Sequence, residues 1–113
     1  MIEVPPDRFE ELVSDALDGI PPQLGALMDN VWVQVDDRRS SGLLGLYEGV
    51  PLTEREAYGG MVMPDRITIY RRSICQVCDI EDEVVEQVRT TVVHEVAHHF
   101  GIDDHRLAEL GWD

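Results

Sequence analysis

The residues best suited to chemistry lie near the end of the chain, in the segment His94-Glu95-Val96-Ala97-His98. On a helix, two histidines four residues apart lie on the same side and one turn apart, because each residue advances the helix by about 100°. Their two imidazoles can therefore bind one zinc ion. Glu95 is placed to accept a proton from a water molecule at that ion without binding the metal itself. We therefore predict that His94 and His98 bind Zn²⁺ and that Glu95 acts as a general base in hydrolysis.

Two further residues extend this pattern to H-E-x-x-H-x-x-G-x-x-D, namely Gly101 and Asp104. Glycine allows a tight reversal of the chain, and metzincin proteases use this turn to return a histidine to the metal three residues later. A carboxylate is also an accepted zinc ligand. We therefore predict Asp104 as the third protein ligand. His105 is the competing candidate, because imidazole is the better zinc ligand and a small change in the turn would present it instead.

The element that must position these residues is a long helix, expected to run from about Asp79 to Phe100. Asp79 is a candidate N-cap, acidic residues fill the first turn, and Gly101 is suited to end the helix in a left-handed turn. An i, i+4 stripe of valines predicts the buried face: Val84, Val88, Val92 and Val96.

Weaker patterns predict the other elements. A first helix is expected from an N-cap at Asp7 to about Ile20, and a last short helix from Asp103 or Asp104. A long loop is expected from Gly49 to Asp65. The other predicted elements are a short helix over Pro22–Met28 and strands over Val31–Val35, Leu43–Glu48 and Ile67–Tyr70. We predict a single α+β domain spanning residues 1–113, with a short β-sheet and the histidine-bearing helix packed on it.

Composition limits the classes of partner. The formal net charge is −14, with 23 acidic against 9 basic residues. This excess of acids argues against nucleic acid and against an anionic membrane surface, but it permits a cationic partner. No signal peptide or membrane span is recognisable, so we expect a cytoplasmic protein. Its two cysteines, Cys75 and Cys78, are then expected to be free thiols in a loop.

Other side chains are weaker candidates. His99 points about 100° away from His98 on the helix, so it is expected at the surface or in packing rather than as a ligand. Tyr47, Tyr58 and Tyr70 are possible donors to an oxyanion, with Tyr58 preferred because it lies in the glycine-rich loop. Trp32 and Trp112 are expected in packing.

Four stretches of the sequence, given below, resemble the minimal zincin family of small bacterial proteins. The similarity covers nearly the whole chain. The matching stretches are Leu44–Gly49, Pro51–Arg55, Pro64–Arg71 and His94–Gly111. The resemblance implies a minimal zincin-like domain with a short mixed β-sheet and a long zinc-motif helix, and metal ligation by His94, His98 and Asp104. It implies no known substrate. Metzincins continue to a methionine turn, whereas no methionine follows Asp104 in this chain.

The leading hypothesis is a zinc-dependent metallopeptidase acting on a peptide or protein substrate, with Glu95 as the general base. An alternative is a zinc-bound protein-interaction module with little or no catalytic activity. A third possibility is a hydrolase acting on a non-peptide amide. The presence of Glu95 favours catalysis, because a purely structural zinc site does not need it.

Overall fold

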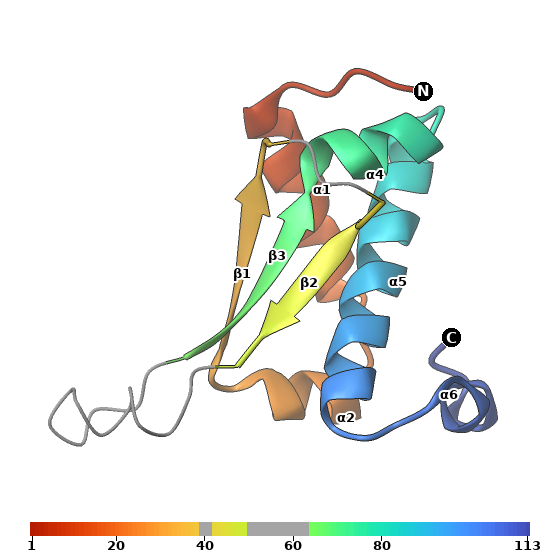
Figure 1. The fold of residues 1–113 in the computed structure, drawn as a ribbon. Helices are drawn as coiled ribbons and strands as arrows, with labels where there is room; N and C mark the ends of the chain where they lie inside the picture. Colours follow the sequence, from red (N-terminus) through yellow and green to blue (C-terminus); the bar gives the residue numbers. More distant parts are fainter. Residues whose placement is uncertain (39–41, 50–63) are drawn as a thin grey trace, which may run out of the picture.

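The computed structural model describes residues 1–38, 42–49 and 64–113 (Figure 1). Its sheet has helices α1 and α5 packed on one face, so the α+β class with a short mixed sheet and a long motif helix is confirmed. In chain order the elements are α1 (Pro6–Asp18), α2 (Pro22–Gly25), the 3-10 helix η1 (Ala26–Met28), β1 (Val31–Asp36), β2 (Gly45–Glu48), β3 (Asp65–Tyr70), α4 (Arg71–Val77), α5 (Glu81–His99) and α6 (Asp104–Leu110).

The three strands lie in the order β1-β3-β2. The central strand β3 is parallel to β1 and antiparallel to β2, and its Ile67 and Ile69 are fully buried. The edge strand β2 lies next to α5 because Gly45 has no side chain. A Cβ atom at Gly45 would come within 2.6 Å of Thr91 Cγ2 on that helix. The close approach of β2 to α5 therefore requires glycine at this position.

Helix α5 supplies the largest share of the core. The predicted valine stripe is confirmed, since Val84, Val88, Val92 and Val96 are all fully buried. At the start of α5 the guanidinium of Arg8 donates to Glu81, with Nη2 and Oε1 2.8 Å apart, and so links α1 to α5. Packing thus fixes the helix along its whole length, including the turns that carry the histidines.

Several boundaries differ from the sequence prediction. Helix α1 has Pro5 rather than Asp7 as its N-cap, and α5 has Ile80 rather than Asp79. Helix α4 was not predicted at all. The expected loop from Gly49 to Asp65 lies almost entirely outside the described residues.

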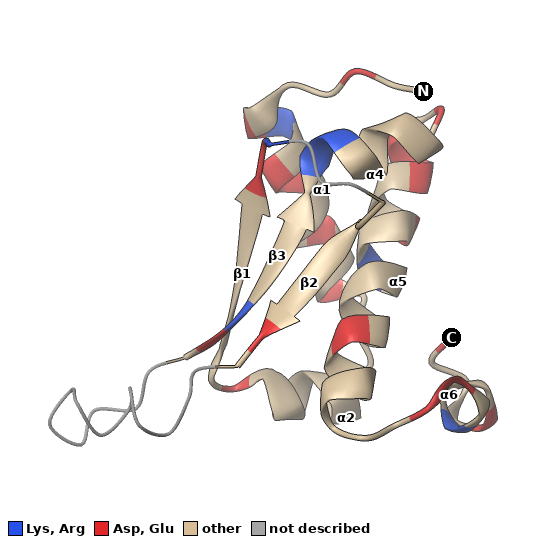
Figure 2. Cartoon of the chain, viewed as in Figure 1, with Lys and Arg blue, Asp and Glu red and all other residues tan. Residues whose placement is uncertain are grey.

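Charge is distributed unevenly over the fold. Acidic residues lie on α1, α5 and α6, whereas several arginines lie near the start of α4, at the opposite end of the sheet from the C-terminus of α5 (Figure 2). Among the helices that the structure describes, none has the length and hydrophobicity needed to cross a membrane.

Candidate metal centre

The last two turns of α5 carry the candidate ligands. His94 and Glu95 are partly buried, whereas the side chain of His98 is 54% exposed. The imidazole rings of His94 and His98 have centroids 5.9 Å apart and are tilted by 42°. Between them, Val96 and Ala97 are fully buried and anchor the opposite side of these turns. The helix therefore presents both rings from one side, as the spacing predicted.

A tight reversal follows the second histidine. Gly101 has φ +77°, the left-handed conformation that the sequence predicted for it. The reversal is closed by two backbone bonds, from Gly101 N–H to the His98 carbonyl at 3.1 Å and from Ile102 N–H to the Ala97 carbonyl at 2.7 Å. Asp103 then caps α6, accepting a hydrogen bond from the backbone N–H of Arg106 at 2.8 Å. The chain thereby returns towards α5.

This return brings Asp104 to His98. Asp104 Oδ1 lies 3.0 Å from His98 Nε2. Two ligand atoms bound at about 2.1 Å to one tetrahedral zinc ion lie about 3.4 Å apart. The observed distance is within a few tenths of an ångström of that value, so the donor atoms of Asp104 and His98 fit a shared zinc ion.

His94, the remaining candidate ligand, does not join His98 and Asp104 in one group. Within the described parts of the chain, no group of three His, Cys, Asp or Glu side chains is close enough together to hold a metal ion as the side chains stand. The backbone spacing of His94 and His98 is correct for one ion. As the side chains stand, only His98 and Asp104 approach each other closely, and the described residues do not form a complete zinc site.

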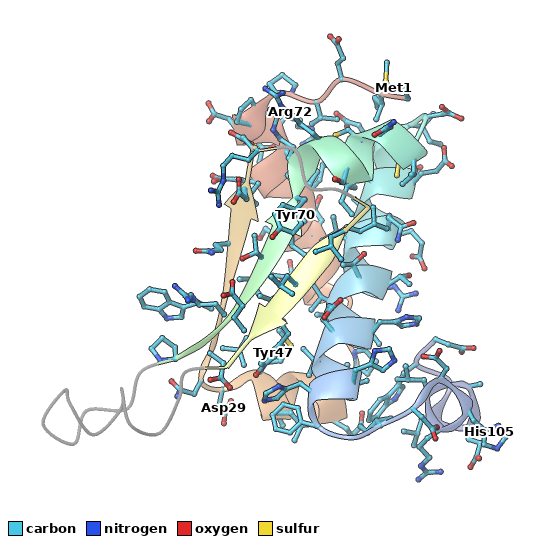
Figure 3. The ribbon with its side chains drawn as sticks, in the orientation of Figure 1. Met1, Asp29, Tyr47, Tyr70, Arg72 and His105 are labelled. Carbon is cyan, nitrogen blue, oxygen red and sulfur yellow. The ribbon has the colours of Figure 1, made fainter. Side chains whose placement is uncertain are left out.

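His105 is oriented differently from Asp104. Its Nε2 lies 2.8 Å from Oε1 of Glu109, one turn later on α6, and its side chain is 86% exposed. In Figure 3 it lies on the side of α6 that faces away from α5. The geometry thus favours Asp104 over His105 as the partner of His98.

A second group of polar side chains lies beside this helix end. Tyr47 on β2 donates its hydroxyl hydrogen to Asp65 Oδ2 at 2.9 Å, and its ring stacks on that of His99 with centroids 3.9 Å apart. His99 therefore has the packing role expected of it. Asp65, at the start of β3, was missed by the sequence reasoning. Its only signal was its place at the junction between the long loop and a strand.

The tyrosines predicted as possible oxyanion donors differ in their distance from the motif. Tyr47 lies beside the C-terminal end of α5, whereas Tyr70 lies at the other end of β3 (Figure 3). The hydroxyl hydrogen of Tyr47 is engaged by Asp65. The preferred candidate, Tyr58, lies outside the described residues.

Two other features are separate from this centre. Cys75 lies in α4, so the prediction of a loop is wrong for it, whereas Cys78 follows the helix as its C-cap. Both are free thiols, as predicted; both are buried, and burial raises the pKa of each. A high pKa leaves little of the reactive thiolate at neutral pH. The two cysteines are therefore poor candidates for redox chemistry.

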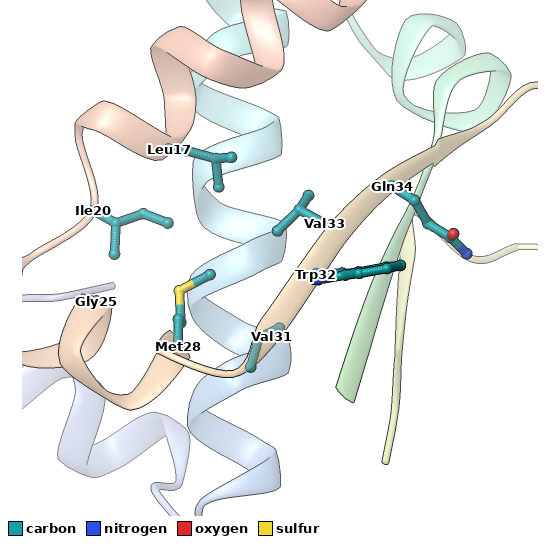
Figure 4. Close-up of a pocket in the computed structure, with 8 residues that line it drawn as sticks. All are labelled: Leu17, Ile20, Gly25, Met28, Val31, Trp32, Val33 and Gln34. Atoms are coloured by element: carbon teal, nitrogen blue, oxygen red, sulfur yellow. The ribbon is translucent and has the colours of Figure 1, made fainter. Parts of the chain in front are cut away.

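The second feature is a pocket of about 510 Å³ beside β1, the opposite edge of the sheet from β2 (Figure 4). Trp32 contributes to its wall and is 65% exposed, so the expectation that this tryptophan is packed is wrong. Trp112, by contrast, is partly buried against the core. The lining of the pocket is Leu17, Ile20, Gly25, Met28, Val31, Trp32, Val33 and Gln34. Because the lining contains no histidine, cysteine or carboxylate, this pocket offers no zinc ligand.

The chain belongs to the zincin-like metallopeptidase family, whose sequence profile matches residues 28–112. Among solved structures, the fold is similar to that of a conserved hypothetical protein from Thermo thermophilus. The TM-score is 0.54 at 22% sequence identity, over 95% of this chain and 98% of the other. No curated protein matches the sequence.

Proposed function

We propose that the protein is a zinc-dependent metallopeptidase in which His94, His98 and Asp104 bind Zn²⁺ and Glu95 is the general base. The observation that carries the proposal is the 3.0 Å approach of Asp104 Oδ1 to His98 Nε2 at the end of the helix that bears the motif. Membership of the zincin-like metallopeptidase family supports it. Bound zinc would supply Lewis acidity, which acidifies water and polarises a substrate carbonyl.

The residues of the chain then have distinct tasks. Glu95, on the same helix face as the histidines, accepts a proton from the attacking water and returns it to the leaving amine. Strand β2, which borders α5, is at one edge of the sheet. An extended peptide can add to that edge through backbone hydrogen bonds, which align a carbonyl without requiring a particular sequence.

Charge suggests a class of substrate for this site. The chain has a net charge of −14. Glu48, the last residue of β2, is already paired with Arg66 (Nη2 to Oε2 3.8 Å), so the expected class of substrate rests on the net charge. We expect basic peptides to be cleaved faster than acidic ones, and we expect this preference to weaken with added salt. Enrichment of acidic residues around the cleavage sites would contradict the charge argument while leaving the metal chemistry intact.

The second candidate function is a zinc-bound interaction module without efficient catalysis. It is favoured by the exposure of the centre, since the side chains of His98 and Asp104 are 54% and 75% exposed. Electrostatic stabilisation of a transition state is weaker in a wet site than in one from which water is excluded.

One experiment separates these functions. Zinc content and cleavage of a broad peptide library and of small non-peptide amides are measured for the wild type and for Glu95→Gln, with a chelated sample as the metal-free control. A peptidase should contain about one zinc per chain. It should lose roughly 10²–10⁴-fold in rate in Glu95→Gln, which keeps its metal.

Zinc binding without cleavage would favour the interaction module. Cleavage confined to small non-peptide amides would favour the third possibility. Cleavage that is equally fast in Glu95→Gln would remove the proposed base.

A further inference from the structure

Three side chains from three elements meet at the C-terminal end of α5: Tyr47 of β2, Asp65 of β3 and His99 of α5. We call them the Tyr47–Asp65–His99 cluster. Tyr47 and His99 stack with their rings inclined by only 20°, and His99 Nε2 lies 3.8 Å from Asp65 Oδ2, the oxygen that accepts the tyrosine hydroxyl. The side chain of Asp65 is only 15% exposed. The cluster thus connects both strands at this edge of the sheet to one turn of the helix.

That turn is the one that bears His98. Helix ends fray, because their last carbonyl groups lack partners in the next turn. The last turn of α5 is continued by the bonds that Phe100, Gly101 and Ile102 donate to it. A metal ligand must nevertheless be held within about 0.5 Å of its productive position. The position of His98 therefore needs support from outside the helix.

Burial of neighbouring residues supplies part of that support, and the cluster supplies the rest. Val96 and Ala97 hold one side of the turn in the core. The stack of His99 on Tyr47 holds the turn at a second point, and Asp65 fixes the tyrosine ring through its hydroxyl. Two anchor points on different sides resist rotation of the turn about the helix axis, which one alone does not.

We propose that the Tyr47–Asp65–His99 cluster positions the last turn of α5 so that His98 and Asp104 are set for zinc before the ion arrives. The proposal rests on the proposed function, and it makes His99 a positioning residue rather than a ligand. Residues that orient ligands from outside the coordination shell typically change metal affinity by about 10–100-fold when they are removed.

Zinc titration of the metal-free protein gives the first test. His99→Ala removes the stack and should weaken zinc affinity by about 10–100-fold. His99→Phe restores a ring against Tyr47 and should recover most of that loss. Tyr47→Phe keeps the stack but removes the hydrogen bond to Asp65, so its loss should be smaller than that of His99→Ala. His105→Ala, which removes another exposed histidine close to the site, is the matched control and should bind zinc as the wild type does.

Co²⁺ in place of Zn²⁺ gives a spectroscopic test, because its visible absorption depends on ligand geometry. His99→Ala should alter this spectrum at saturating Co²⁺, whereas a variant that merely lowers global stability would not. Thermal melting of each metal-free variant shows whether the fold is retained. An unchanged spectrum and unchanged zinc affinity in a folded His99→Ala would overturn the proposal.

Amide hydrogen exchange of the metal-free chain separates this proposal from the proposed function. His99→Ala should speed exchange at Phe100, Gly101 and Ile102, whose N–H groups close the turn. If the wild type takes up no zinc, the proposed function fails, but faster exchange in the variant still supports the cluster as the anchor of the turn. Unchanged exchange overturns that anchor whatever the metal result.

Discussion

The two halves of α5 differ in the residues that they carry on the side away from the core. From Glu81 to Val92 the helix is held by buried valines and by the link from Arg8 to Glu81, and this half carries none of the motif residues. From Val93 to His99 the same buried stripe continues through Val96, but the remaining surface carries the motif residues. One continuous core face thus supports the polar residues of the motif. The comparison predicts that substitutions of buried residues, such as Val88 in the first half, change stability, and that substitutions of the motif residues in the second half change metal binding.

The largest effect should come from the two histidine candidates. His94→Ala or His98→Ala should reduce bound zinc from about one ion per chain to almost none, because each removes one of the three proposed protein ligands. The free energy of unfolding of the metal-free His98→Ala protein should stay within about 0.5 kcal/mol of the wild-type value, since the side chain is largely exposed. Metal analysis and calorimetry measure both quantities. A full equivalent of zinc retained by either variant would show that the ligand assignment is wrong.

Next in size is the choice between the two residues of α6. Asp104→Ala should weaken zinc affinity by at least about 10–100-fold. That is the loss typical of removing a residue that only orients a ligand, and removing a ligand itself should cost at least as much. His105→Ala should leave the affinity unchanged, because this histidine contacts Glu109 instead. Parallel zinc titrations decide the matter. A loss confined to His105→Ala would reverse the assignment.

The first half of the helix should show the opposite pattern. Val88→Ala empties a fully buried position and should cost about 1–3 kcal/mol of the free energy of unfolding. Its zinc affinity should match that of the wild type while the protein is folded. Chemical denaturation and zinc titration of the same sample make the comparison. If Val88→Ala weakened zinc binding as strongly as His99→Ala, the two halves would not be independent.

The smallest effect should come from the surface pair at the start of α5. The hydrogen bonds from Arg8 hold the pKa of Glu81 below its ordinary value. A lowered folded-state pKa gives stability that is present above the unfolded-state pKa and is lost as the pH falls through the folded-state value.

Glu81→Gln should therefore melt slightly below the wild type at pH 7. The difference should shrink as the pH falls below the ordinary glutamate value of 4.5. Glu10→Gln is the control, because Glu10 forms no ion pair with another residue that the structure describes. A difference that grows in acid would contradict the sign.

The sequence was sufficient where the structure depends on neighbours along the chain. Helix α5, its valine stripe, the turn at Gly101 and the last short helix all follow from local spacing, and all are present. The relation of His94 to His98 is likewise a property of one helix. These features needed no knowledge of the rest of the fold.

The sequence was insufficient where structure depends on contacts between distant segments. Helix α4 is short and has a weak apolar pattern, so Arg71–Val77 was not recognised as a helix. Asp79 was predicted as an N-cap, but its carboxylate is bound to the N-terminal ammonium group of Met1. The meeting of Tyr47 with Asp65 depends on the register of β2 against β3, which the sequence alone does not give.

The reversal at Gly101 has a consequence for how zinc affects the stability of the protein. All three candidate zinc ligands lie between residues 94 and 104, so only short stretches of chain must be closed to gather them. The entropy lost on closing a loop grows with its length, so this site is among the least costly a chain can form. If the proposed ligands hold zinc, the unfolded chain should therefore retain some affinity for it through the same residues, although it lacks the folded cluster that sets them. Because binding to the unfolded state offsets stabilisation of the folded one, zinc should raise the melting temperature by less than its affinity alone implies.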